Sequence, residues 1–255
     1  MTEPQSERAL PVGVQVGLPL VLAAVFAVIF QGIHPTDELR TELLYPALVA
    51  GGCLAGQLWY VSRAVPSRVS HGPLAGLSGV ANALTLFRGA LYAVVAGFVV
   101  VPAGTSLVWV PALAYGTGVV LDKLDGVAAR TVGDVTVLGR RLDMAFDTFG
   151  FVVAPLVAVL WGQLPVWYLS LSAARFVYRG GIAWRQFRSR PLFTEPDSDI
   201  GRYLAGVQMV FLTVALAPVI PTWLVWAVAP FVLVPSLLIF SRDFLTVSGR
   251  LSTRG

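Results

Sequence analysis

Eight runs of apolar residues divide the chain, and each is about long enough for a helix to cross a bilayer, which takes roughly 20 residues. The runs cover residues 12–33, 43–62, 84–101, 107–128, 139–161, 166–187, 203–220 and 222–241. The chain of 255 residues is 56% hydrophobic and only 13% charged, a composition that excludes an ordinary soluble domain. The pattern therefore predicts an all-α, polytopic membrane protein with eight transmembrane helices.

Charged residues are distributed unevenly between the ends of these runs. The connections at residues 102–106, 162–165 and around Pro221 are short and uncharged, whereas most arginines lie at the opposite ends. Because positive residues favour the cytoplasmic side, we expect a multi-pass protein of the cell membrane with both termini in the cytoplasm, together with the connection between the runs at 107–128 and 139–161. The net charge of +4 forms no continuous basic arm, so membrane lipids rather than nucleic acids are the expected partners.

Five aspartates between residues 122 and 147 interrupt the apolar pattern. Asp122 and Asp125 are three residues apart and Asp143 and Asp147 four apart, so each pair projects from one face of a helix. The two pairs also mirror each other along the chain. A helical hairpin turning near residues 133–134 would place Asp125 opposite Asp143 and Asp122 opposite Asp147. Four carboxylates are therefore expected to converge at one depth, at the cytoplasmic ends of two helices.

Such a cluster cannot stand unpaired, because repulsion in a poorly solvated place would force protonation or separate the helices. Divalent cations remove this repulsion, and hard oxygen ligands without nearby His or Cys favour Mg²⁺ or Mn²⁺. Four carboxylates suit two ions, an arrangement that holds a phosphate and stabilises in-line displacement at phosphorus. The small residues Gly126, Ala129 and Gly139 would leave space for a bulky phosphorylated ligand, and Arg130 offers it a positive fork.

The same residues resemble the signature of the CDP-alcohol phosphotransferase family, D-x2-D-G-x2-A-R-x8-G-x3-D-x3-D, at every fixed position. The matching residues are Asp122, Asp125, Gly126, Ala129, Arg130, Gly139, Asp143 and Asp147. The resemblance covers roughly residues 74–247 and implies the family's six-helix core, so the first two helices would be extra. We therefore expect an N-terminal extension at residues 1–72, a catalytic core at residues 73–247 and a cytoplasmic tail at residues 248–255.

By this resemblance the protein is expected to be a phosphatidyltransferase of phospholipid biosynthesis. An acceptor hydroxyl would attack the lipid-side phosphorus of a CDP-activated lipid and release CMP. Asp122, Asp125 and Asp143 would hold one metal ion, and Asp122, Asp143 and Asp147 the second. Asp147 would also be the catalytic base that takes the acceptor's proton. A homodimer is expected from the family as well.

A second stretch of the resemblance concerns the CDP-lipid. Asn82, Thr85 and Arg88 follow three-residue steps and look like the N-x-x-T-x-x-R sequence that contributes to the CDP-lipid site in the family. Spacing alone is nearly as well explained by a helix cap at Asn82 and an arginine that snorkels to the interface. Thr136 corresponds to a small hydroxyl position that touches the nucleotide in related phosphatidylinositol-phosphate synthases. The residues expected to bind the CDP-lipid are Asn82, Thr85, Gly126, Arg130, Thr136 and Gly139.

Arginines inside the sixth run suggest where the acceptor binds. Arg175 and Arg179 lie one turn apart and too deep to be loop charges, and intramembrane arginines are by default functional. They would either bind a phosphate on the acceptor, with Arg190 or Arg242 completing the pocket, or form a structural ion pair with the aspartates. A phosphate pocket favours glycerol 3-phosphate. Inositol phosphate, inositol and serine stay open as acceptors, as does a diacyl or an isoprenoid-ether lipid as donor.

Two further stretches resemble phosphatidylglycerophosphate synthases and favour the same acceptor. They are GRYLAGVQ, which ends at Gln208, and RDFLTVSGR, which begins one residue before Asp243. Their departures from that subgroup are Arg202, Ala205, Asp243 and Val247.

Two functions of other classes compete with the transferase. A cation transporter would use the carboxylates as a transport site, but such sites favour the bilayer midplane and broken helices. A catalytically silent relative would serve as a membrane scaffold, and decay of its site would be expected to remove at least one aspartate. The intact signature at the ends of two helices therefore favours the transferase.

Overall fold

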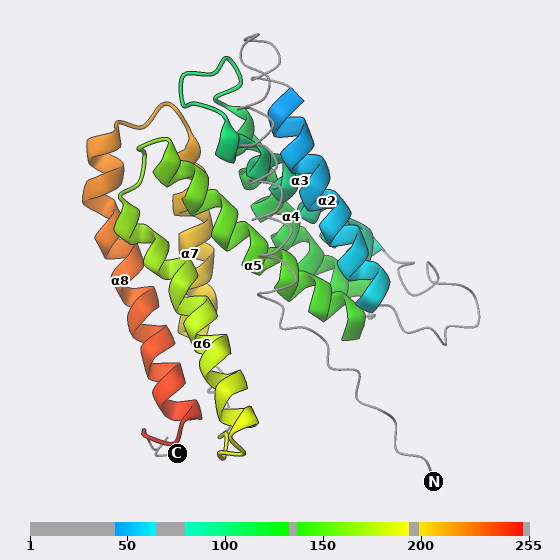
Figure 1. Ribbon diagram of the computed structural model, residues 1–255, viewed down its shortest axis with the longest axis vertical. Helices are drawn as coiled ribbons and strands as arrows, with labels where there is room; N and C mark the ends of the chain where they lie inside the picture. The colour runs from blue at the N-terminus through cyan, green and yellow to red at the C-terminus, as the bar shows by residue number, and fades with distance from the viewer. Residues whose placement is uncertain (1–43, 65–79, 133–136, 194–198, 252–255) are drawn as a thin grey trace, which may run out of the picture.

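The computed structural model describes residues 44–64, 80–132, 137–193 and 199–251, and this part of the chain contains α-helices, two short 3-10 helices and no strand (Figure 1). The α-helices are α2 (Tyr45–Ala64), α3 (Val80–Gly97), α4 (Val110–Val132), α5 (Val137–Leu160), α6 (Ser170–Phe187), α7 (Asp199–Leu216) and α8 (Thr222–Val247). The 3-10 helices are η3 (Phe98–Val100) and η4 (Val166–Leu169). The expected all-α fold is confirmed.

Each apolar run from residue 43 onward coincides with one of these α-helices. The run at residues 166–187 starts as η4 and continues as α6, and the first run, at residues 12–33, lies outside the described residues. Three described helices are long and apolar enough to cross a membrane by length and composition: Leu142–Leu160 within α5, then α7 and α8. A shorter apolar helix covers Leu84–Val100. These helices indicate a membrane protein, while the arrangement of six core helices plus two extra ones stays a prediction.

The outer surface of α8 agrees with a lipid environment. Trp223 and Phe231 are 71% and 78% exposed, and Leu238 on the same helix is 65% exposed, which suits a helix surrounded by lipid. Asp122 of α4 and Arg175 of α6 instead face other helices, as described below for the site.

Helix α3 lies at the centre of the bundle and packs against α2, α4 and α5. Helix α7 packs against α4, α5 and α8, and α6 packs against α8. The core is formed by buried side chains such as Tyr92 and Ala96 of α3 with Val153 and Val157 of α5. Because α3 contacts both α4 and α5, its side chains can reach the carboxylates of both helices.

Helix α2 belongs to the expected N-terminal extension, yet it packs closely on α3. Gln57 Nε2 donates a hydrogen bond of 3.0 Å to the carbonyl oxygen of Gly89. A Cβ atom added at Gly97 would lie 2.5 Å from the carbonyl oxygen of Pro46, so only glycine permits this approach. Val61 is buried beside Leu142 and Phe146 of α5. The division of the chain at residue 72 stays a sequence prediction, whereas α2 itself is part of the bundle.

The connections between helices divide into two ends of the molecule. The uncharged connections α3–α4, α5–α6 and α7–α8 lie at the upper end in Figure 1, opposite the last residues of α6 and α8. At the lower end, Arg185 of α6 donates hydrogen bonds of 3.0 Å to the carbonyl oxygens of Pro191 and Ser248. Arg185 therefore fastens the end of α6 to the end of α8.

Candidate active site

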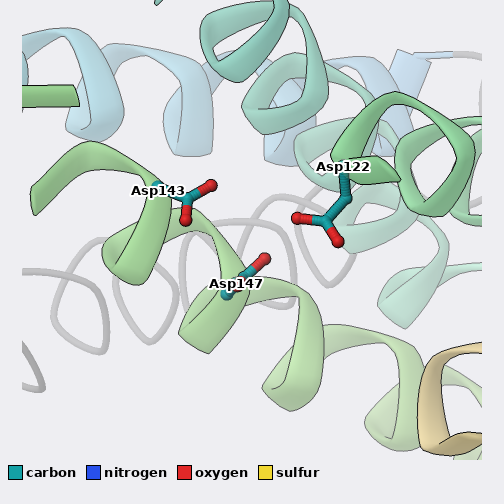
Figure 2. A group of neighbouring side chains, drawn as sticks. All are labelled: Asp122, Asp143 and Asp147. Carbon is teal, nitrogen blue, oxygen red and sulfur yellow. The ribbon is translucent and has the colours of Figure 1, made fainter. Parts of the chain in front are cut away.

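Three aspartates from two helices meet between α4 and α5. One carboxylate oxygen from each of Asp122, Asp143 and Asp147 lies within 4.8 Å of the other two. Figure 2 shows the three side chains pointing toward a common space, Asp122 from α4 and the other two from successive turns of α5. Helix α4 ends at Val132 and α5 begins at Val137, on either side of the predicted turn. The predicted convergence of these three carboxylates is confirmed, and the side chain of Asp125 lies outside the described part of the chain.

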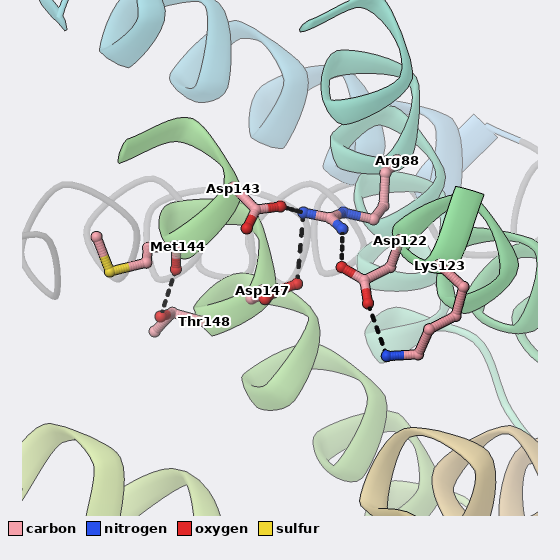
Figure 3. Close-up of polar contacts among 7 residues, drawn as sticks. All are labelled: Arg88, Asp122, Lys123, Asp143, Met144, Asp147 and Thr148. Carbon is pink, nitrogen blue, oxygen red and sulfur yellow. Dashed lines mark hydrogen bonds and ion pairs between the residues drawn. The ribbon is translucent and has the colours of Figure 1, made fainter. Parts of the chain in front are cut away.

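A buried arginine from α3 enters the middle of this cluster. The guanidinium of Arg88 donates hydrogen bonds through Nη1 to Asp122 Oδ1 and through Nη2 to Asp143 Oδ1 (Figure 3). Its Nη2 also lies 3.4 Å from Asp147 Oδ1. Arg88 is 1% exposed, so the alternative in which it snorkels to the interface is wrong. The reason is that α3 lies against both α4 and α5, which turns Arg88 inward toward three acidic partners.

Sequence reasoning named Arg88 as part of a motif but missed its pairing with the aspartates. A signal for it was present in the pattern of charges. Arg88 is the single charged residue in the run at residues 84–101, and a buried arginine in an apolar helix requires an acidic partner. The carboxylates of the neighbouring runs were the natural candidates, although the spacing alone could not say which of them face α3.

The chemistry of this cluster fits a divalent cation. Its donors are carboxylate oxygens, which are the hard ligands that Mg²⁺ and Mn²⁺ prefer. Asp147 Oδ1 is buried, lies 3.4 Å from Arg88 Nη2 and accepts no hydrogen bond from the described residues, so its lone pairs can serve a metal ion. The three carboxylates of Asp122, Asp143 and Asp147 face one guanidinium, so negative charge exceeds positive charge at this position.

Two neighbours complete the polar surroundings. Lys123 is exposed and its Nζ lies 3.2 Å from Asp122 Oδ2. Thr148, which follows the fourth aspartate of the signature, is buried and donates a hydrogen bond of 2.7 Å to the carbonyl oxygen of Met144 (Figure 3). Its hydroxyl is thus used by the α5 backbone, and this position supplies no positive charge.

A tyrosine ring separates α4 from α5 one helical turn away from the carboxylates. Tyr92 follows Arg88 by one turn of α3 and lies between Gly118 of α4 and Gly150 of α5. A Cβ atom at Gly118 would lie 2.5 Å from Tyr92 Cε1, and one at Gly150 would lie 2.7 Å from Tyr92 Cε2. Gly118 precedes Asp122 by one turn, so the ring fixes the spacing of the two helices next to the site.

The two predicted acceptor arginines of α6 lie against α5. The Cζ atom of Arg175 lies 4.9 Å from the centroid of the Phe151 ring, a cation–π contact one turn along α5 from Asp147. Arg179 Nη2 lies 3.8 Å from Met144 Sδ, beside Asp143 in the sequence. Both arginines therefore face the helix that carries Asp143 and Asp147.

The other two predicted acceptor residues lie elsewhere. Arg190 is exposed beyond the end of α6, and Arg242 pairs with its neighbour Asp243 through an Nη2 to Oδ1 contact of 2.7 Å. Their part in an acceptor pocket stays a prediction.

The residues expected to bind the CDP-lipid are only partly described. Thr85 is buried on α3, one turn before Arg88. Asn82, Asp125, Gly126, Arg130 and Gly139 lie within helices, but their side chains are outside the described part of the chain, and Thr136 lies outside it altogether. Their contacts with a nucleotide stay predictions.

Gln208, whose surrounding sequence resembles a synthase stretch, is fully engaged in packing. Its Oε1 accepts a hydrogen bond from the Tyr168 hydroxyl, and its Nε2 donates to Val232 O at 2.9 Å and to Ser236 Oγ at 3.0 Å. These bonds join α7, η4 and α8 inside the bundle. Gln208 therefore stabilises helix packing and gives no support to a particular acceptor.

Comparison with known families agrees with this geometry. The family model described as CDP-alcohol phosphatidyltransferase matches residues 79–234, which is more than half of the chain and runs from the start of α3 into α8. The match contains Arg88 and all three carboxylates of the cluster and leaves out α2. Searches of curated proteins and of solved structures gave no match. The chain belongs to the CDP-alcohol phosphatidyltransferase family.

Proposed function

We propose that the protein is an integral membrane transferase that moves a phosphatidyl or archaetidyl group from a CDP-lipid to the hydroxyl of a small polar acceptor. The acceptor oxygen forms a bond to the lipid-side phosphorus, the bond from that phosphorus to CMP breaks, and CMP leaves. Family membership supports this kind of reaction. The observation that carries the proposal is the meeting of Asp122, Asp143 and Asp147 within 4.8 Å.

The carboxylates have two roles in this proposal. Asp122, Asp125 and Asp143 would hold one Mg²⁺ or Mn²⁺ ion, and Asp122, Asp143 and Asp147 a second. When bound, the ions would neutralise the diphosphate and stabilise the displacement at phosphorus. Asp147 would take the proton of the acceptor hydroxyl, and its buried Oδ1, which accepts no hydrogen bond from the described residues, supports this role.

The CDP moiety would lie on the α3 and α4 side of the cluster. Asn82, Thr85, Gly126, Arg130, Thr136 and Gly139 are the residues proposed to hold it. The lipid tails would leave sideways between helices into the bilayer.

We propose glycerol 3-phosphate as the acceptor, because Arg175 and Arg179 both face α5 beside the aspartates. A doubly charged phosphate offsets the desolvation of two guanidinium groups better than a neutral polyol does. Inositol phosphate, which shares the phosphate, is the nearest alternative. Inositol and serine lack that charge and fit the arginines less well.

Replacing Arg175 by alanine is expected to raise the apparent KM for the acceptor by at least roughly tenfold, which corresponds to about 1.4 kcal/mol of binding. The KM for CDP-lipid should change little, because the two proposed metal ions and Arg130 would balance the charge of the donor's diphosphate. Arg202→Ala is the matched control, since Arg202 is exposed and pairs with Asp199 at the start of α7. Loss of CDP-lipid affinity alone would instead make Arg175 a structural partner of the aspartates.

The proposed orientation places both termini and the carboxylates on the cytoplasmic side. The uncharged connections lie together at the other end of the bundle (Figure 1), as the positive-inside rule requires. A cysteine placed at Ser252 is expected to resist an impermeant thiol reagent added outside intact cells, and the buried Cys53 gives little background. Rapid labelling from outside would show that the protein has the opposite orientation in the membrane.

The reaction itself is tested by giving the purified protein labelled CDP-lipid, Mg²⁺ and a panel of acceptors, and identifying the lipid product by mass spectrometry. CMP release should require both the metal and a phosphorylated acceptor. A cation transporter would release no CMP and would carry Mn²⁺ into liposomes. Helices α4 and α5 run unbroken through the aspartates, which favours the enzyme over a transporter. Crosslinking in membranes tests the homodimer, which we propose from the family alone.

A further inference from the structure

Arg88 occupies a position that the proposed reaction does not explain. Its two terminal nitrogens contact carboxylates of two helices, Asp122 on α4 and Asp143 and Asp147 on α5. The side chain is 1% exposed, and its Nε is buried without a hydrogen-bond partner in the described part of the chain. A diphosphate could reach this guanidinium only by displacing an aspartate, which argues against a direct contact with the CDP-lipid.

The contacts of Arg88 oppose the repulsion within the cluster. Three carboxylates whose oxygens lie within 4.8 Å of one another repel strongly in a poorly solvated place, and this repulsion would push α4 and α5 apart. A guanidinium keeps its charge at any physiological pH and binds carboxylates through several donors at once. Arg88 is therefore a permanent cation, fixed to a third helix, at the place where the two acidic helices meet.

The same carboxylates are also the proposed ligands of the metal. Asp122 Oδ1, Asp143 Oδ1 and Asp147 Oδ1 all face Arg88, so a metal ion that binds them must share or replace these contacts. The positive charge of Arg88 then opposes the binding of a second cation. It also keeps the carboxylates assembled when a metal ion leaves.

From this geometry we propose that Arg88 is a positioning residue, a built-in counter-ion that holds the carboxylates of α4 and α5 together without metal and lowers their affinity for divalent cations. The proposal rests on the divalent site of the proposed function. In this proposal Arg88 raises the stability of the protein without metal and reduces its affinity for metal. An arginine with a purely structural role would not reduce the metal affinity.

The test compares the full-length wild-type protein in detergent with Arg88→Gln and Arg88→Lys. Thermal unfolding is followed in EDTA and at graded Mg²⁺, and Mn²⁺ binding is measured by the electron paramagnetic resonance signal of the free ion. In EDTA, Arg88→Gln should unfold about 4 °C or more below the wild type. Its Mn²⁺ dissociation constant should fall by about tenfold, equivalent to about 1.4 kcal/mol, so saturating metal should recover most of the lost stability.

Two further variants make the result specific. Arg88→Lys keeps the charge but loses the double contact, so its Mn²⁺ affinity should stay near that of the wild type while its stability in EDTA falls. Arg185→Gln is the control, because the hydrogen bonds of Arg185 in the described part of the chain go to backbone carbonyl oxygens at the far ends of α6 and α8. It should lower stability equally with and without metal and leave Mn²⁺ affinity unchanged.

An Arg88→Gln protein that binds Mn²⁺ as the wild type does, or more weakly, would overturn the proposal. So would a selective loss of CDP-lipid affinity, which would make Arg88 a ligand of the nucleotide. If Arg88→Gln fails to fold, Arg88→Lys decides: wild-type Mn²⁺ affinity with reduced stability in EDTA supports the proposal, and any other result refutes it. A wild-type protein that binds no Mn²⁺ would refute the proposed function itself, which is a separate outcome.

Discussion

Replacing Asp147 by asparagine is expected to abolish CMP release while leaving much of the CDP-lipid binding. The substitution removes the proposed general base, which by itself is typically worth about 10²- to 10⁴-fold in rate, and also one metal ligand. It removes few contacts to the nucleotide, which is proposed to lie nearer to α3 and α4. Turnover is measured as CMP released at saturating Mg²⁺, and CDP-lipid binding by equilibrium titration.

Two variants show whether this effect is specific. Asp122→Asn should damage both turnover and CDP-lipid binding, because Asp122 belongs to both proposed metal sites. Asp199→Asn is the matched control, since Asp199 is exposed at the start of α7 and pairs only with Arg202 in the described contacts. Near-normal turnover by Asp147→Asn would remove Asp147 from the reaction.

Adding one methyl group at Gly118 is expected to impair both folding and turnover. The new Cβ atom of Gly118→Ala would lie 2.5 Å from Tyr92 Cε1, and the ring cannot withdraw because Gly150 lies against its other edge. Overpacking of this kind costs about 1–3 kcal/mol. Because Gly118 precedes Asp122 by one helical turn, any shift of α4 also moves a carboxylate of the site. CMP release should therefore fall by more than the loss of folded protein explains.

The chain offers good controls for this substitution. Nothing lies within 4 Å of a Cβ atom added at Gly180 of α6 or Gly206 of α7, so alanine there should be neutral or stabilise the helix by up to about 1 kcal/mol. Replacing Tyr92 by leucine in the Gly118→Ala protein should restore part of the lost stability. Identical behaviour of Gly118→Ala and Gly206→Ala would show that the ring does not set the helix spacing.

The sequence predicted the helices and the carboxylate cluster because both depend on local patterns. Apolar runs of about 20 residues and the three- and four-residue spacing of the aspartates follow directly from helix geometry. Asp122 and Asp147 are nearly equally far in sequence from a turn at residues 133–134, and a tight helical hairpin leaves little freedom in register. This was enough to predict that Asp122 lies near Asp147. Each of these inferences needed only residues that are close in the chain.

The position of Arg88 could not be predicted in this way, because it depends on how three helices pack. Its spacing from Asn82 and Thr85 defines a face of α3, but not which helices that face meets. A polar residue in an apolar helix can bind a ligand, reach the interface or pair within the bundle, and the sequence leaves all three open. Gln208 illustrates the same limit, because its resemblance to a synthase stretch favoured a particular acceptor while its hydrogen bonds serve packing.

Helix α2 shows a further limit of reasoning by resemblance. The resemblance begins at about residue 74 and implies six core helices, so this helix was expected to belong to an extension, and the family match likewise begins after it, at residue 79. Its contacts with α3, and the burial of Val61 beside Leu142 and Phe146, bring it next to the turn of α5 that carries Asp143. These contacts arise from tertiary packing that no local pattern encodes.

We propose that carboxylates from α4 and α5 jointly hold a divalent cation at the place where the CDP-lipid reacts. Its most direct test is anomalous diffraction from crystals of the protein grown with Mn²⁺ and a CDP-lipid. We expect anomalous peaks bounded by the carboxylates of Asp122, Asp143 and Asp147, with the diphosphate of the CDP-lipid beside them. Manganese bound elsewhere, or a CDP-lipid diphosphate remote from these three residues, would contradict the account.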